Sequence, residues 1–197
     1  AVAAVYFALS LFLSRGEKIK GTVFFLFGLF FHNIVLIFSF LNLFFIQKLL
    51  LTKKIHFYLK IIFLVAIVFL FCRLITSIGL ILLTDRIANY ADSTYSEERS
   101  FLHPVNIRSI LLLAFFVILR PKKESKFYDF LTIIYALGIG FRLGFYDFLI
   151  LSGRISTMFT FAEIFLIPLV LQERFNKLVL IFFIFIYFSM NLYINIF

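Results

Sequence analysis

Residues 128–150 read YDFLTIIYALGIGFRLGFYDFLI and residues 155–172 read ISTMFTFAEIFLIPLVLQ, with only a short segment between them. The apolar residues come as runs rather than as a stripe at helical spacing. Each run has about the 20 residues that a helix needs to cross a bilayer. The segment Ser152-Gly153-Arg154 is long enough only for a tight turn. We therefore predict an antiparallel pair of transmembrane helices joined at Arg154.

The rest of the chain repeats this pattern. Of its 197 residues, 63% are hydrophobic, whereas a soluble domain is about half apolar. Pro104 suits the first turn of a helix, because its missing N–H has no partner there. The fold class we predict is all-α, a polytopic transmembrane helix bundle of about six to seven spans that forms one domain over residues 1–197. The sequence begins in an apolar run without a Met, so we expect it to be the later part of a longer chain. Further apolar runs cover residues 1–13, 21–47, 55–84, 104–119 and 178–197.

The net charge of +9 comes mostly from Lys and Arg in the short connections between apolar runs. Such residues hold their connections on the cytoplasmic side of the membrane, so this charge predicts topology and no nucleic-acid partner. Connections 48–54, 120–126 and 173–177 should face the cytoplasm. The long polar segment 85–103 and the turn at Arg154 should then face outward.

One stretch does not fit this scheme. The segments 14–20 and 48–54 are both basic and should both face the cytoplasm, yet residues 21–47 are too few for two full spans. Two half-length helices that meet at His32 and Asn33 would reconcile the charges, because polar backbone at that depth is tolerated where protein or a wet cavity surrounds it. One long tilted span that breaks the charge rule is the alternative, and the sequence leaves both open.

Four charged residues lie inside predicted spans, where an ionised group costs about 3 kcal/mol and calls for a partner or a wet cavity. Arg142 and Glu163 are expected at similar depth on neighbouring antiparallel helices, so we predict that they form an ion pair. Asp147 should lie nearer the outer interface, below Arg154. Arg73 is followed at helical spacing by two hydroxyl residues, which predicts a polar helix face. Purely structural pairing and headgroup contacts are the alternatives for each of these residues.

The sequence predicts no metal site and no cofactor. The only cysteine, Cys72, is isolated in an apolar run, where we expect an inert packing residue, and the histidines share no ligand spacing. The three histidines lie in three different segments, at His32, His56 and His103. Three glycines indicate close helix packing rather than a nucleotide-binding loop, namely Gly138, Gly140 and Gly144.

Two stretches together resemble the EpsG and Wzy group of bacterial polysaccharide polymerases. The first is AVAAVYFALSLFLSRGEKIKGTVFFLFGLFFHN, residues 1–33, which is similar to an alanine-bearing helix, a basic turn and a short helix that ends in a Phe-His pair, here Phe31 and His32. The second is SGRISTMFTFAEIFLIPLVL, residues 152–171, in which Arg154, Phe159 and Pro168 match the family pattern. Met158 stands where the family often has Tyr.

The resemblance implies a reaction in the bacterial cytoplasmic membrane. A glycan linked to a polyprenyl diphosphate would be transferred to a sugar hydroxyl of another lipid-linked repeat unit, with the lipid diphosphate leaving. A guanidinium is well shaped to hold a diphosphate, so Arg154, with Arg142 or Arg73, is the expected binding group. Membrane lipid and other membrane proteins of polysaccharide assembly are the further partners that the resemblance implies.

Such a transfer also needs a base to take the proton of the acceptor. His32, Asp147 and Glu163 are the candidates, and the sequence does not rank them. A transporter or flippase for lipid-linked sugars or another anionic solute is the main alternative function, since the same charges would line its path. A purely structural membrane subunit is a third.

Overall fold

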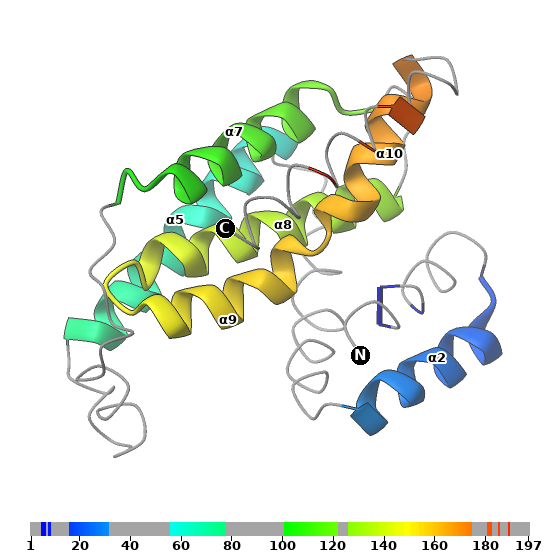
Figure 1. Cartoon of the computed structure of the whole chain (residues 1–197), viewed down its shortest axis with the longest axis horizontal. Coiled ribbons are helices and arrows are strands. Elements are labelled where there is room, and N and C mark those ends of the chain that lie inside the picture. Colours follow the sequence, from blue (N-terminus) through cyan, green and yellow to red (C-terminus); the bar gives the residue numbers. More distant parts are fainter. Residues whose placement is uncertain are drawn as a thin grey trace.

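The computed structural model describes residues 5, 6, 8, 16–31, 56–77, 101–121, 126–174, 181, 182, 185 and 189. Within these residues the chain forms helices and turns and no strand, so the all-α prediction is confirmed there (Figure 1). The helices with continuous bounds are α2 (Lys18–Phe31), α5 (Phe57–Ser77), α7 (Pro104–Ile118), α8 (Lys126–Gly144), α9 (Leu149–Thr160) and α10 (Glu163–Arg174).

Three of the described helical stretches are long and apolar enough to cross a membrane: Phe57–Ser77, Lys126–Gly144 and Ser152–Gln172. The last of these runs through α9 and α10. The shorter apolar helix α7 begins with Pro104 in its first turn, as predicted, and His103 caps it by accepting a hydrogen bond from the Val105 N–H at 3.3 Å. The total of six to seven spans stays a prediction.

The turn predicted at Ser152-Gly153-Arg154 is wrong, because these residues lie inside α9. The chain instead reverses between Gly144 and Leu149. One glycine costs a helix only about 1 kcal/mol, and the Ser152 hydroxyl donates to the Arg142 carbonyl at 3.0 Å across the reversal. This short polar triplet is therefore helical, and its serine hydroxyl is hydrogen-bonded to the neighbouring helix α8.

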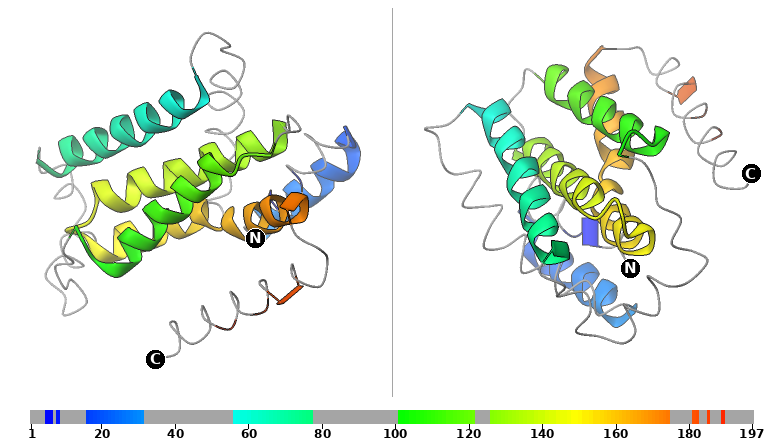
Figure 2. Two further views of the ribbon diagram at one scale, coloured as in Figure 1. Left: turned by 90° about the horizontal axis from the view of Figure 1, so that it is seen from above. Right: turned by 90° about the vertical axis from the view of Figure 1, so that its left-hand side faces the viewer.

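Helix α8 is the centre of the bundle. Figure 2 shows α5 on one side of it, α9 on the other and α7 above them. Within the described residues, α5, α7, α9 and α10 pack against α8, and 78% of its apolar window is buried inside the protein. A helix so enclosed needs small residues where its neighbours come close.

Glycines meet that need on two faces of α8. A Cβ added at Gly140 would lie 2.7 Å from the Cβ of Val68, and one at Gly144 would lie 2.4 Å from the Cβ of Cys72, both on α5. The four-residue spacing of these glycines puts them on one helix face, as in small-residue contacts between membrane helices. Gly138 gives the same close approach to Phe159 of α9, at 2.8 Å. The prediction of glycine-mediated helix packing is confirmed.

One end of the bundle holds the reversal between α8 and α9, and we call it the turn end. Figure 1 shows the C-terminus of α5 and the N-terminus of α7 at the same end. At the opposite end, Arg120 forms two hydrogen bonds with Asp129, at 2.8 and 2.6 Å, and its guanidinium lies 4.7 Å from the ring centroid of Phe57. This bidentate pair closes the connection between α7 and α8.

The outer faces of the peripheral helices are apolar and exposed. On α5 this face includes Leu59, Ile62, Phe63, Leu70 and Phe71. Large apolar side chains that water would disfavour suit contact with lipid chains. The residue His32, the predicted break beside it and most of the segment 85–103 lie outside the described residues.

The close contact between α8 and α5 predicts that Gly144→Ala lowers stability. The added Cβ would overlap Cys72, so α5 must move away, and overpacking of this kind costs about 1–3 kcal/mol. Gly153→Ala is the matched control, because nothing lies within 4 Å of a Cβ there. Thermal unfolding of the detergent-solubilised chain measures both. Equal unfolding temperatures for the two variants would contradict the packing account.

Candidate functional site

Polar side chains gather where α7, α8, α9 and α10 face one another. We call this group the polar seam, and it consists of Arg108, Ser109, Tyr135, Arg142, Ser156 and Glu163. Ser109, Tyr135 and Ser156 are buried, with at most 3% of their surface exposed. Polar groups removed from water are costly unless they are hydrogen-bonded. The contacts within the seam supply those hydrogen bonds.

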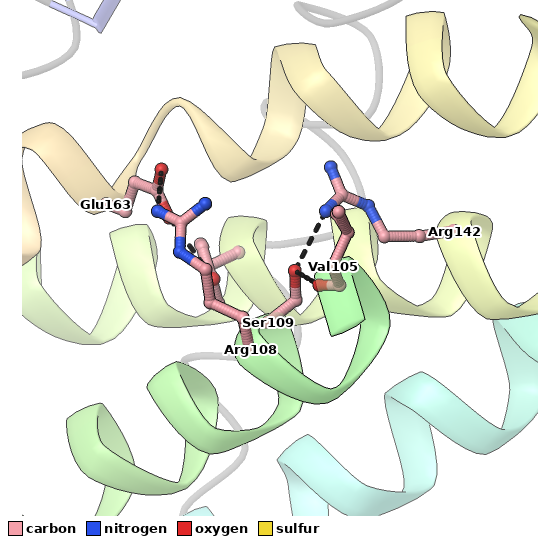
Figure 3. A network of polar contacts seen from close by, with 6 residues as sticks. Val105, Arg108, Ser109, Arg142 and Glu163 are labelled. Atoms are coloured by element: carbon pink, nitrogen blue, oxygen red, sulfur yellow. Dashed lines mark hydrogen bonds and ion pairs between the residues drawn. The ribbon is translucent and has the colours of Figure 1, made fainter. Parts of the chain in front are cut away.

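Arg142 joins three helices through hydroxyl groups. Its Nε donates to the Ser156 Oγ of α9 at 3.1 Å, and its Nη1 donates to the Ser109 Oγ of α7 at 2.9 Å. Figure 3 shows the Arg142 and Ser109 side chains pointing toward one another. Because the guanidinium is planar and rigid, two fixed donors also fix its orientation.

Glu163 receives its contacts from two other helices. Arg108 of α7 contacts it with Nη2 to Oε1 at 3.3 Å, and the Tyr135 hydroxyl of α8 donates to Oε2 at 3.4 Å. The Glu163 side chain is 19% exposed and that of Arg108 is 36% exposed. Both carboxylate oxygens of Glu163 are thus contacted, in a mostly buried position. Figure 3 shows Arg108 and Glu163 beside the contact between Arg142 and Ser109.

The predicted ion pair between Arg142 and Glu163 is therefore wrong, since Glu163 pairs with Arg108. The error follows from the misplaced turn. Arg142 lies level with Ser156 of α9, whereas Glu163 lies level with Tyr135 of α8. The seven residues from Tyr135 to Arg142 amount to about 10 Å of helix rise. Arg142 and Glu163 share the seam only through the neighbouring residues Arg108 and Ser109.

A break between α9 and α10 determines where Glu163 lies. The Ala162 N–H donates to the Phe159 carbonyl at 3.3 Å, rather than to the Met158 carbonyl as in a regular α-helix. The Tyr6 hydroxyl lies at the carbonyls of Met158 and Phe159, at 3.1 and 3.0 Å. A side chain inserted into the helix ladder is a recognised cause of a kink. Glu163 is the first residue after this break.

The ring of Tyr6 is fully buried and fixes the same break by packing. It is stacked on Phe165, with ring centroids 5.6 Å apart, and lies 5.7 Å from Phe161. Both rings belong to the segment around the break. Tyr6 therefore ties residues near the start of the sequence to the position of Glu163.

The candidate residues Arg73 and Asp147 meet at the turn end, outside the polar seam. Arg73 forms an ion pair with Asp147, and its guanidinium lies 4.9 Å from the ring centroid of Tyr146. The hydroxyls of Thr76 and Ser77 donate to carbonyls of their own helix, at 2.8 and 2.9 Å. The polar face predicted on α5 thus consists of Arg73 itself.

The remaining candidate residues lie elsewhere. Arg154 is on the exposed face of α9, whereas Ser152, Ser156 and Phe159 of the same helix are buried. It therefore points away from the seam that contains Arg142. His32 lies outside the described residues. Its role as a base and that of Arg154 in binding diphosphate stay predictions.

Sequence reasoning missed Arg108, Ser109, Tyr135 and Ser156. Arg108 could have been predicted from the sequence. It is a cation one turn into the predicted helix that starts at Pro104, and a hydroxyl residue follows it directly. A tyrosine or serine inside an apolar run carries no comparable signal. Among the described residues, no group of three or more His, Cys, Asp or Glu gathers as a metal site would require.

Comparison with known proteins identifies the family of this chain. The sequence model of the EpsG family matches residues 1–197, the whole of this sequence. No curated protein and no solved structure matches the chain. The family match thus extends well beyond the two stretches that first indicated it.

The Arg108–Glu163 contact predicts how single and double charge changes affect stability. Arg108→Glu or Glu163→Arg alone would place two like charges together in a partly buried position. We expect each to cost about 1–3 kcal/mol, less than the about 3–5 kcal/mol of a fully buried broken pair. The exchange of both charges should recover most of that loss. Thermal unfolding of the purified variants measures it, and a double variant as unstable as the singles would contradict the pairing.

The contact of Tyr6 with the helix break predicts that Tyr6→Phe straightens the segment. Without the hydroxyl, the two carbonyls lose a donor, and α9 and α10 should approach one continuous helix. Spin labels on cysteines at the exposed positions Thr157 and Gln172, with Cys72→Ser, would report the change. Their separation should rise toward the about 22 Å rise of fifteen helical residues. Tyr58→Phe, which changes an exposed tyrosine of α5, should leave it unaltered.

Proposed function

This chain belongs to the EpsG family along its whole sequence, and from that premise we propose that it is a polysaccharide polymerase of the bacterial cytoplasmic membrane. The reaction joins oligosaccharide repeat units carried on polyprenyl diphosphate. The bond between the sugar C1 and the diphosphate oxygen breaks, and a new bond forms between C1 and an acceptor hydroxyl oxygen. The proton of the acceptor goes to a base, and the polyprenyl diphosphate leaves with the bonding electrons.

The observation that carries the proposal is the convergence of two guanidinium groups on one polar seam. Arg108 from α7 and Arg142 from α8 both reach it, and Ser109 stands next to Arg108 while accepting from Arg142. A diphosphate leaving group gains negative charge as its bond to C1 breaks. Fixed cations aimed at developing charge in a site of low dielectric stabilise the transition state. Guanidinium groups also match the geometry of phosphate oxygens.

We assign the role of base to Glu163. Among the candidate bases within the described residues, it is the one in the seam with Arg142, whereas Asp147 pairs with Arg73 at the turn end. The Tyr135 hydroxyl and Arg108 hold its two oxygens. A base needs such orientation to take a proton from a hydroxyl within hydrogen-bond reach. When substrate binds, Arg108 would release Glu163 and contact the diphosphate instead.

The orientation that we predict for the bundle in the membrane supports this assignment. The charge rule puts the turn end on the outer face, and the Arg120–Asp129 pair at the opposite end belongs to a connection expected in the cytoplasm. The seam then lies within the membrane near its outer half, where a lipid-linked diphosphate can reach it from the bilayer. The glycan of that substrate extends outward, past the turn end.

The proposal predicts that Arg142→Ala shortens the surface polysaccharide without removing the protein from the membrane. A hydrogen bond to a charged group contributes about 1.5–3 kcal/mol, so polymerisation should slow about tenfold to a hundredfold. Ser156→Ala, which removes one of the two hydroxyl partners, should have the same effect to a smaller degree. Electrophoresis of polysaccharide from cells that carry each variant measures chain length.

Thr157→Ala is the matched control for Ser156→Ala. Thr157 is the next residue of α9, is exposed, and its hydroxyl donates to the Gly153 carbonyl of its own helix at 2.6 Å. Chain length should be unchanged in this variant. If Arg142→Ala cells accumulate lipid-linked single repeat units outside the membrane, the polymerase is supported. If those units remain inside, transport is the function, and if long chains persist, the seam has neither role.

A further inference from the structure

We propose that the turn end carries a binding site for the sugar residues of the glycan, formed by Phe101, Tyr146, Arg73 and Asp147. This inference rests on the proposed function, because it assigns to that reaction a second site for its substrate. The glycan site is distinct from the polar seam, which we assign to the diphosphate and the reacting hydroxyl. Arg73 and Asp147 thereby receive a role that differs from the diphosphate binding and base roles considered for them from the sequence.

The four residues come together from three separate parts of the chain. Arg73 is near the C-terminus of α5, Phe101 precedes α7, and Tyr146 and Asp147 lie in the reversal between α8 and α9. The rings of Phe101 and Tyr146 lie edge to face, with centroids 6.1 Å apart, and Phe69 packs against Phe101 at 6.5 Å. These contacts hold the rings in fixed directions.

The group presents both kinds of surface that a sugar ring recognises. One face of many pyranoses is lined with C–H groups and packs on an aromatic ring, while the hydroxyls at its rim bind planar charged groups with paired donors or acceptors. Phe101 is 43% exposed, and the side chains of Arg73 and Asp147 are about one-third exposed. Rings and charged groups are therefore both accessible at the same place.

The Arg73–Asp147 pair has features that a simple structural link does not need. An ion pair this exposed contributes little to stability, at most about 1 kcal/mol. Its guanidinium also lies against the Tyr146 ring, which keeps donors of Arg73 and acceptors of Asp147 beside an aromatic face. A fixed donor–acceptor pair next to an aromatic ring matches the C–H face and the hydroxyl rim of a sugar.

The position of the group relative to the seam fits one continuous substrate. Arg142 is in the last turn of α8, which ends at Gly144, and Tyr146 follows in the reversal at the turn end. A diphosphate held at Arg142 would thus place the first sugars at the level of Tyr146, in the direction of the turn end. That direction is outward in the proposed orientation, as the glycan of a lipid-linked repeat unit requires.

The absence of tryptophan from this sequence allows a direct binding test. Phe101→Trp would introduce a tryptophan at the proposed site of this 197-residue chain, purified in detergent micelles. The probe is the oligosaccharide repeat unit released by mild acid from the host's own surface polysaccharide. We expect its addition to shift and saturate the tryptophan emission. Adding Tyr146→Ala or Arg73→Ala should raise the half-saturating concentration about tenfold or more.

Two controls make the result specific. Tyr58→Ala, which removes an exposed tyrosine from the other end of α5, should leave the half-saturating concentration unchanged. Inorganic diphosphate should not compete with the oligosaccharide. An emission that the oligosaccharide does not change, or an equal response in the Tyr146→Ala protein, overturns the glycan site.

The binding test is independent of polymerisation, so the two proposals can fail separately. Saturable oligosaccharide binding together with normal polysaccharide from Arg142→Ala cells would keep the glycan site and overturn the role of the seam. Short chains from Arg142→Ala cells without oligosaccharide binding would keep the seam and overturn the glycan site.

Discussion

The close approach of α5 and α9 to α8 is the contact on which the rest of the structure depends. In a bilayer, lipid chains are as apolar as leucine, so helices associate through dispersion contacts and hydrogen bonds rather than through the hydrophobic effect. Gly138, Gly140 and Gly144 let the neighbouring backbones come within the distance that a Cβ would occupy. The polar side chains of α7, α8 and α9 reach one another because α8 is enclosed in this way.

The polar groups within the bundle are paired in a consistent manner. Arg142 donates to hydroxyls on α7 and α9, Arg108 contacts Glu163, and Arg73 contacts Asp147. An unpaired charge at the depth of Arg142 or Glu163 would cost several kcal/mol, so the contacts of these two residues also specify which helices are neighbours. The same pairs leave charged groups in fixed positions that a substrate with phosphate and hydroxyl groups can use. Stability and function therefore draw on the same residues, and charge-exchange variants are needed to separate them.

The family and the geometry contribute different parts of the functional account. Membership of the EpsG family gives the class of protein, one of membrane-bound polysaccharide biosynthesis. The structure adds Arg108, which the sequence reasoning had not considered, and puts Glu163 rather than Asp147 in the same seam as Arg142. It also puts Arg73 and Asp147 together at the turn end, with Tyr146 beside them. The division into a diphosphate site and a glycan site is our interpretation of this separation.

The sequence by itself determined the helical fold class, the apolar runs that become α5, α7 and α8, the start of α7 at Pro104 and the glycine packing of α8. Each of these depends on local composition, spacing or the missing N–H of proline. The sequence did not determine where α8 ends, since Ser152-Gly153-Arg154 is compatible with either a turn or a helix. In the structure the triplet is helical, and the Ser152 hydroxyl donates to the Arg142 carbonyl. Nor did it determine that Glu163 pairs with Arg108. Partners in an ion pair depend on the depth and facing of whole helices, which only the tertiary structure decides.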